Sequence, residues 1–172
     1  MTYDMSGSFS NATAHQSPLY CKGNDCFSVS VAIQAYLDAG CTPQQLNMGV
    51  PFYAHQFNNV VASTAPDKDI PGIGANFTGP TESTCQTDPK HCVPTYGAGA
   101  ASWKSHELWD DEAQASYSYD VASKTLYSYD NTRAIVAKKD YATKKGLGGF
   151  MFWVMGADDS QHTLLSAISK GL

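Results

Sequence analysis

Cysteine is the residue type in this chain whose spacing most directly limits the possible chemistry. The chain has 172 residues, and its cysteines all lie in the first 92: Cys21, Cys26, Cys41, Cys85 and Cys92. Cys21 and Cys26 are close enough in sequence to close a small loop, as are Cys85 and Cys92, which leaves Cys41 over. Zinc is the alternative because His91 adjoins Cys92, but both spacings are loose for zinc ligands. The pattern favours disulfides between Cys21 and Cys26 and between Cys85 and Cys92, and no metal.

Acidic, serine and histidine residues form no complete catalytic set in the sequence. Asp110, Asp111 and Glu112 are consecutive, so their side chains point in different directions, and a solvated turn or cap explains them better than an acid–base pair. No G-x-S-x-G motif and no metalloprotease helix motif occur. The stretch G-A-G-A-A-S at 97–102 does not follow a strand and open a helix, as a dinucleotide site requires. The sequence therefore predicts no cofactor.

Composition limits the class of protein and its partners. Hydrophobic residues make up 42% and charged residues 16%, which is typical of an ordered globular chain. The net charge of −5, with scattered Lys and Arg, argues against binding to nucleic acid or to an anionic membrane. No apolar run approaches the roughly 18 residues that a membrane-spanning helix needs. We therefore expect no nucleic-acid partner and no membrane.

Two N-glycosylation sequons, at Asn11 and Asn76, accompany the cysteines. Together they favour an oxidising, secreted setting. Residues 1–20 nevertheless lack the basic start and apolar middle of a signal peptide. This mismatch leads us to expect that the natural chain starts upstream of Met1.

The apolar pattern indicates which elements must position any site. It predicts a short strand at 1–5, a helix at 29–39, a buried strand at 46–57, hairpins at 107–130, a helix from 131 to about 145, a strand at 150–155 buried on both faces, and a last helix capped by residues 158–160. Residues 58–102 are rich in Gly, Pro, Thr and Asn and have no long periodicity, which indicates an excursion from the main fold. The order predicts an α/β chain with an α+β insertion.

Six motifs extend over essentially the whole chain. They are M-T-Y-D at 1–4, S-P-L-Y at 17–20, G-V-P-F-Y at 49–53, L-W-D-D-E-A at 108–113, Y-S-Y-D-N at 127–131 and G-L-G-G-F-M-F-W at 146–153, followed by Asp158 and Asp159. Each is weak alone, but in this order they resemble the C-terminal part of a chitinase of glycoside hydrolase family 18, from the subgroup that carries an α+β insertion.

The resemblance implies that the chain contains the last three βα units of a TIM (β/α)8 barrel. Three such units are too few to close a barrel. Barrel strands 6 and 7 would lie within residues 1–57, the α+β insertion domain within 58–130, and barrel helix 7, strand 8 and helix 8 within 131–172. The N-terminal part of the barrel would then be a partner of this chain, and its absence would expose an apolar strand edge at 1–5.

The resemblance also implies a site for chitin or chito-oligosaccharides. Hydrolysis in this family is substrate-assisted, since the acetamide oxygen of the substrate attacks the anomeric carbon. Tyr3 would bond the acetamide carbonyl, and Asp4 would bind a sugar hydroxyl beside it. Met1 would pack under the same sugar, Trp153 would form its apolar floor, and Tyr53 would line the cleft. Core packing is the alternative for Trp153, and a surface hydroxyl and a turn cap are the alternatives for Tyr3 and Asp4.

Besides the absence of the first four to five barrel strands, the chain departs from the family pattern at two points. The acid-bearing motif D-x-x-D-x-D-x-E does not occur in the 172 residues, so the catalytic acid is expected upstream and this chain alone is expected to be inactive. Ala54 and His55 stand where many relatives carry Gly and Arg. Two functions follow: the C-terminal part of a secreted chitinase that cleaves β-1,4-linked N-acetylglucosamine polymers, or a non-catalytic chitin-binding lectin. A truncated product without a stable fold is a third, minor possibility.

Overall fold

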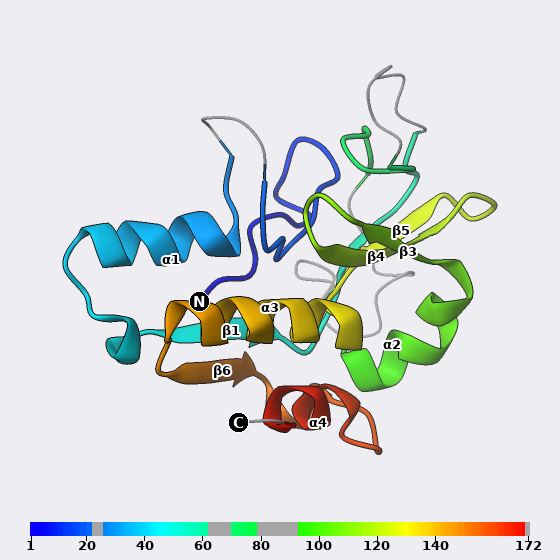
Figure 1. Ribbon diagram of the computed structural model, residues 1–172. Coiled ribbons are helices and arrows are strands. Elements are labelled where there is room, and N and C mark those ends of the chain that lie inside the picture. The colour runs from blue at the N-terminus through cyan, green and yellow to red at the C-terminus, as the bar shows by residue number, and fades with distance from the viewer. Residues whose placement is uncertain (22–25, 62–69, 79–92, 171–172) are drawn as a thin grey trace.

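The strands of the described residues form two separate sheets (Figure 1). The structure is a computed structural model that describes residues 1–21, 26–61, 70–78 and 93–170. A parallel pair joins β1 (Asn47–Pro51) to β6 (Gly149–Trp153). An antiparallel sheet has the strand order β2 (His55–Phe57), β5 (Thr125–Ser128), β4 (Ala115–Asp120) and β3 (Glu107–Asp110). This combination confirms the predicted α/β class.

Helices α1 (Val29–Asp38) and α3 (Thr132–Lys145) pack against β1. The Ser28 side chain caps α1, and Asn131 caps α3 by accepting a hydrogen bond from the amide of Ala134 at 2.9 Å. Gly146, with φ of 69°, ends α3 in the left-handed conformation that glycine adopts without strain. Both helices match the predicted ranges because these caps are local sequence signals.

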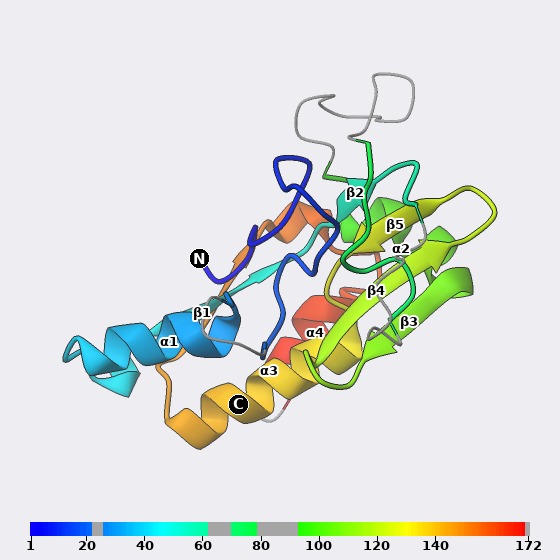
Figure 2. The same cartoon turned by 90° about the horizontal axis from the view of Figure 1, so that it is seen from above.

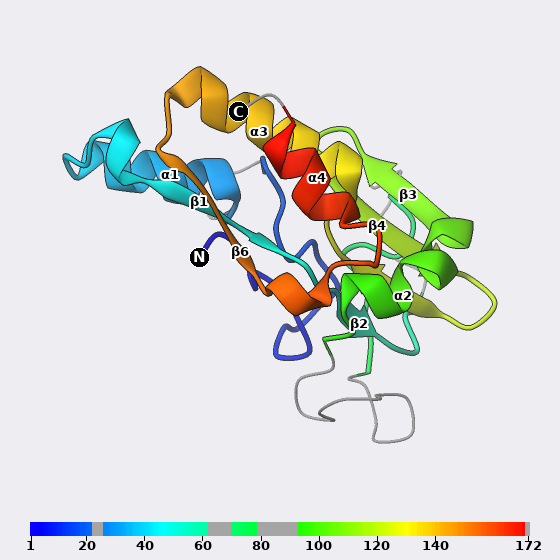
Figure 3. The same ribbon diagram turned by 90° about the horizontal axis from the view of Figure 1, so that it is seen from below.

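Helix α4 (Thr163–Ser169) runs beside α3, and α2 (Tyr96–Trp103) lies next to the antiparallel sheet (Figure 3). Asp158 and Asp159 accept hydrogen bonds from backbone amides at the start of α4, which confirms the predicted cap. Trp103 of α2 stacks on Tyr127 with ring centroids 5.2 Å apart, and this aromatic contact joins α2 to β5. Three short 3-10 helices complete the described elements: η1 (Pro43–Gln45), η2 (Lys104–His106) and η3 (Met155–Ala157).

The antiparallel strands follow the predicted hairpins (Figure 2). Residues 121–124 form the turn between β4 and β5. A cluster of buried apolar side chains packs on one face of this sheet and includes Phe57, Tyr117 and Leu126. The predicted domain boundaries after residues 57 and 130 stay a prediction, and β2 already pairs with β5 before the first of them.

The predicted strand at residues 1–5 is not formed. Asp4 has φ of 58°, which interrupts an extended chain. The segment is held beside β1 instead, because the Thr2 hydroxyl donates to the carbonyl oxygen of Gly49 at 2.6 Å. The amide of Met5 donates to the carbonyl oxygen of Gln16 at 2.9 Å.

Two further strands differ from prediction. The predicted strand at 46–57 is divided between the sheets, because the chain leaves β1 after Pro51 and enters β2 at His55. Strand β6 is only half-buried, whereas its apolar sequence predicted burial on both faces. The reason is that β1 is its one strand partner among the described residues.

The described part of the chain also bears on the cysteines and sequons. Cys21 and Cys26 form a disulfide, and Cys41 is a free, half-buried thiol. Cys85, His91 and Cys92 lie outside the described residues. Asn11 and Asn76 are both exposed. None of the described helices is long and apolar enough to cross a membrane, and no cluster of potential metal ligands occurs in the described segments.

One buried ion pair links three segments. Lys138 of α3 is completely buried, and its ammonium donates to Asp130 Oδ2 at 2.5 Å and to the hydroxyl of Ser17. Asp130 follows β5, and Ser17 belongs to the loop that follows residues 1–5. A buried charge is tolerated only when it is paired and hydrogen-bonded, so these three residues depend on one another.

We expect Lys138→Met to lower the free energy of unfolding by about 3–5 kcal/mol, because Asp130 would keep a buried charge without its partner. The measurement is urea unfolding of the protein. The control is Lys144→Met on the exposed side of the same helix, which should change the free energy by less than about 0.5 kcal/mol. Equal unfolding midpoints for the two variants would contradict the importance of the pair.

Candidate functional site

Asp4 accepts two short hydrogen bonds through a single oxygen. Its Oδ1 lies 2.6 Å from the hydroxyl of Tyr53 and 2.7 Å from His55 Nε2. The left-handed backbone of Asp4, which Asp and Asn adopt more readily than other side chains, turns the carboxylate toward these partners. Tyr53 lies between β1 and β2, and His55 begins β2. The contacts therefore fix Asp4 at the point where the chain passes from the parallel to the antiparallel sheet.

Electrostatics keep Asp4 ionised and its tyrosine neighbours protonated. Partial burial pushes the pKa of Asp4 upward, but the hydrogen bonds from His55 and Tyr53 outweigh it and hold the pKa below its usual value. Burial, and then the bond to Asp4, raise the pKa of Tyr53. Burial and the charge of Asp4 also raise the pKa of Tyr3. At neutral pH the site thus offers a carboxylate acceptor and phenol donors.

Tyr3 reaches across β1 because position 49 is a glycine. A Cβ atom on Gly49 would lie 2.9 Å from the Tyr3 ring, closer than such contacts allow. The Tyr3 hydroxyl contacts the sulfur of Met151 at 3.8 Å, and Met151 pairs with Gly49 in the parallel sheet. Tyr3 also meets Tyr53 edge to face, with ring centroids 6.1 Å apart. Met1 is 90% exposed.

A cavity of about 340 Å³ lies beside Asp4. The described residues that line it are Asp4, Ser8, Phe9, Tyr53, His55, Val93, Thr95, Trp153, Val154 and Ala157. Trp153 is the last residue of β6 and is 59% exposed, so core packing does not explain it. Of the predicted site residues, Asp4, Tyr53 and Trp153 line this cavity. Tyr3 contacts Tyr53 next to it, and Met1 is not among the described lining residues.

Sequence reasoning missed several residues of this cavity. His55 was noted from the sequence only because many relatives carry Arg at this position. Its spacing of two from Tyr53 would allow both side chains to lie on the same face of an extended segment. Phe9 comes from the loop after residues 1–5, and Val93 and Thr95 come from the segment before α2. Their approach to Asp4 depends on tertiary packing, for which the sequence contains no local signal.

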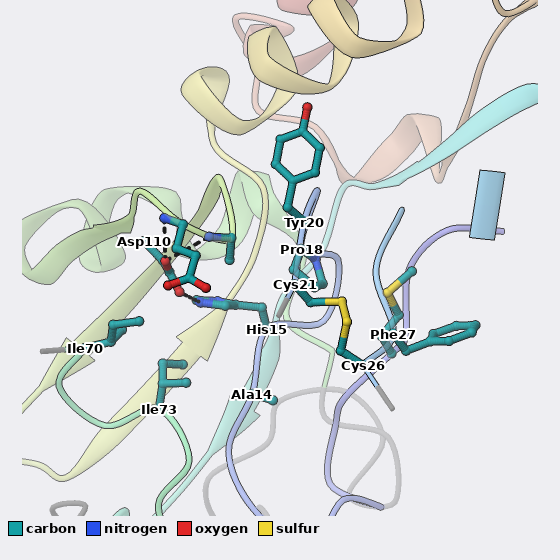
Figure 4. A pocket seen from close by; sticks show the side chains of 13 residues that line it. Ala14, His15, Pro18, Tyr20, Cys21, Cys26, Phe27, Ile70, Ile73 and Asp110 are labelled. Carbon is teal, nitrogen blue, oxygen red and sulfur yellow. Dashed lines mark hydrogen bonds and ion pairs between the residues drawn. A yellow bond between two sulfur atoms is a disulfide. The ribbon is translucent and has the colours of Figure 1, made fainter. Parts of the chain in front are cut away.

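A second cavity, of about 770 Å³, lies elsewhere and contains none of the predicted substrate-binding residues (Figure 4). His15 Nε2 is 2.9 Å from Asp110 Oδ2 at its wall, and the disulfide of Cys21 and Cys26 lies across from them. Asp110 is a cap, as predicted, since it accepts hydrogen bonds from the amides of Glu112 and Ala113. It is buried rather than solvated, however, because His15 covers it.

The cavity beside Asp4 can hold a neutral ligand that has hydroxyl groups and an apolar face. The carboxylate of Asp4 can accept from a hydroxyl group, while the exposed indole of Trp153 offers a flat apolar surface. Asp4 itself cannot act as a proton donor near neutral pH, since its pKa lies below the usual value for a carboxyl group. The geometry therefore supports binding and orientation rather than proton transfer.

Comparison with known proteins adds a family to this geometry. Residues 1–158 match the model of Glycosyl hydrolases family 18. The chain is 32% identical over 162 residues to Endochitinase 1 of Metarhizium robertsii, covering 92% of this chain and 35% of that protein. It is 30% identical over 191 residues to Chitinase 1 of Aphanocladium album, covering 100% and 38%. The chain thus spans little more than a third of the length of these relatives.

Solved structures give the same result. A cell-surface-expressed, multi-modular chitinase of a Paenibacillus strain superimposes with a TM-score of 0.81 at 26% identity, covering 98% of this chain and 18% of that chain. A chitinase of Cycas revoluta in complex with (GlcNAc)4 superimposes with a TM-score of 0.77 at 25% identity, covering 97% and 44%.

The hydrogen bonds of Asp4 predict a pH-dependent contribution to stability. The folded-state pKa is lower than the unfolded value, so the contribution is present above about pH 4 and is lost as pH falls through the folded pKa. We expect Asp4→Asn, which tolerates the same backbone, to lower the thermal midpoint at neutral pH but not at about pH 2. Asp140→Asn on exposed α3 surface is the control. A midpoint difference for Asp4→Asn that is constant with pH would contradict the prediction.

Proposed function

The chain belongs to family 18 of the glycosyl hydrolases, and from this membership we propose that it forms the substrate-holding, C-terminal part of a chitinase. Its α/β fold is part of the TIM barrel of that family. The proposed substrates are polymers of β-1,4-linked N-acetylglucosamine. The observation that carries the proposal is that Asp4, Tyr53 and Trp153, from three separate segments, line one cavity.

The proposed mechanism is substrate-assisted and retaining. The acetamide oxygen of the bound sugar attacks its anomeric carbon, and the glycosidic oxygen leaves with a proton from a general acid. Water then opens the cyclic intermediate, and the acetamide is restored. The protein must hold the acetamide under the ring during this attack.

The residues of this chain suit the holding role. The Tyr3 hydroxyl is protonated and can donate to the acetamide carbonyl, and its one hydrogen-bond partner among the described residues is the weak sulfur acceptor of Met151. Asp4 can accept a hydrogen bond from a sugar hydroxyl. Trp153 can stack on the C–H face of the sugar and keep water away from it. We propose that a D-x-x-D-x-D-x-E motif supplies the general acid of this reaction; the motif does not occur in these 172 residues.

A chitin-binding lectin of the same family is the second candidate. The specific observation that favours it is that Asp4, the carboxyl group among the described residues of the cavity, is ionised and held by two donors. Binding needs the carboxylate and the indole but no proton donor. The two candidates share the ligand and differ only in turnover.

A secreted location is part of the proposal. It is supported by the disulfide between Cys21 and Cys26, since such bonds persist in oxidising compartments. The exposure of Asn11 and Asn76 is compatible with glycan at either sequon.

Replacing Trp153 tests the proposed floor of the site. Binding of (GlcNAc)4 is measured by calorimetry with the longest form of the protein that its transcript encodes. We expect Trp153→Ala to weaken binding by about tenfold or more, as removal of an aromatic anchor does, and Trp153→Tyr to retain most of the affinity. The control is Trp109→Phe, because Trp109 lies in β3 under Arg133 and away from the cavity. Equal affinity for Trp153→Ala and the wild type would remove the proposed floor.

Turnover separates the two candidate functions. Release of reducing ends from chitin by the same preparation supports the chitinase, whereas binding without release supports the lectin. Absence of both binding and release contradicts both.

A further inference from the structure

We propose that His55 is the positioning residue that orients Asp4 toward a bound saccharide, and that saccharide affinity therefore follows the protonation of this imidazole. The inference rests on the proposed function and adds a form of regulation to it. It starts from a contact that the sequence did not indicate, between His55 Nε2 and Asp4 Oδ1.

The geometry leaves one carboxylate oxygen for a ligand. Tyr53 and His55 both bond to Oδ1 of Asp4, and no donor among the described residues is bonded to Oδ2. The Asp4 side chain is 46% exposed beside the cavity, whereas that of His55 is only 9% exposed. The buried imidazole thus holds the carboxylate through Oδ1 and leaves Oδ2 for a ligand.

His55 is itself held tightly. The ring of Phe9 meets it edge to face with centroids 6.0 Å apart, and the ring of Tyr53 does so at 5.9 Å. A Cβ atom on Gly7 would lie 2.8 Å from His55 Nδ1, so only glycine lets the loop after residue 5 close over the imidazole. A group clamped on three sides can hold Asp4 in one orientation.

The titratable neighbours of His55 keep their charge states near neutral pH. Asp4 stays ionised, because its pKa is held below the usual value, and Tyr53 and Tyr3 stay protonated, because their pKa values are raised. Asp130, whose charge acts on Tyr53, is paired with Lys138. Imidazole is the side chain that ordinarily changes charge between about pH 5 and pH 8.

Protonation of His55 changes what Asp4 can offer. The neutral imidazole donates Nε2–H and leaves the full negative charge on the carboxylate. The imidazolium forms an ion pair with Oδ1 and draws charge away from Oδ2, which then accepts more weakly from a sugar hydroxyl. Saccharide affinity is therefore higher when His55 is neutral and falls as the pH decreases.

The test compares His55→Gln with His55→Leu in the longest form of the protein that its transcript encodes. Glutamine can place an amide N–H where Nε2 lies but does not titrate, and leucine has no donor. Calorimetry with (GlcNAc)4 is run at about pH 8 and about pH 5. We expect the wild type to lose about tenfold in affinity at the lower pH, His55→Gln to bind equally at both, and His55→Leu to bind about tenfold more weakly at pH 8, the loss expected for one charge-assisted hydrogen bond.

Three outcomes overturn the inference while the proposed function survives. They are wild-type binding that does not change with pH, a pH dependence that persists in His55→Gln, and wild-type affinity of His55→Leu at both pH values. Failure of the wild type to bind at either pH overturns the proposed function, and the inference with it. His106→Gln, an exposed histidine on η2, is the matched control and should behave as the wild type. Thermal midpoints identify a variant that is merely misfolded.

Discussion

The buried ammonium of Lys138 places a strict condition on the rest of the fold. It is completely enclosed, so its charge must be met by Asp130 and Ser17 in a fixed arrangement. These partners come from the end of the antiparallel sheet and from the loop that follows Asp4. A single helix side chain thereby determines how the loop is placed relative to both sheets. An apolar side chain at position 138 could fill the same volume, but it would not require Asp130 and Ser17 to lie at fixed positions. Selecting one conformation in this way is the role attested for some buried polar groups.

The site occupies the boundary that this arrangement creates. Tyr53 and His55 lie where the chain changes from the parallel to the antiparallel sheet, and both bond to Asp4 from a third segment. The carboxylate of Asp4 thus links residues 1–5 by hydrogen bonds to the segment that connects the two sheets. The exposed end of β6 contributes Trp153 to the same cavity. The cavity accordingly depends on the relative position of the two sheets, and not on either sheet alone.

Sequence reasoning succeeded where the determining signals are local. The spacing of apolar residues located α1 within a few residues, Asn131 and Gly146 located the two ends of α3, and the aromatic alternation located β4 and β5. It failed at residues 1–5, because the left-handed Asp4 is stabilised by tertiary hydrogen bonds. Burial of β6 was overestimated, since an apolar run does not reveal how many strands flank it. Asp4, Tyr53 and Trp153 were found by resemblance, whereas the contact of His55 with Asp4 needed coordinates.

The pairing of β2 with β5 places the first and the last strand of the antiparallel sheet, in sequence order, side by side. His55 is the register partner of Ser128, and the Gln16 side chain donates to the carbonyl oxygens of both Tyr53 and Ser128, at 2.7 and 3.0 Å. The segment between β2 and β5 starts and ends at neighbouring strands. Its loops can therefore change in length without moving β1 or β6, because the entropic cost of closing a longer loop grows only slowly. In evolutionary terms, this part of the molecule is free to acquire or lose residues while the parallel strands stay as they are. Diversity of sequence among related chains should therefore accumulate between these two strands.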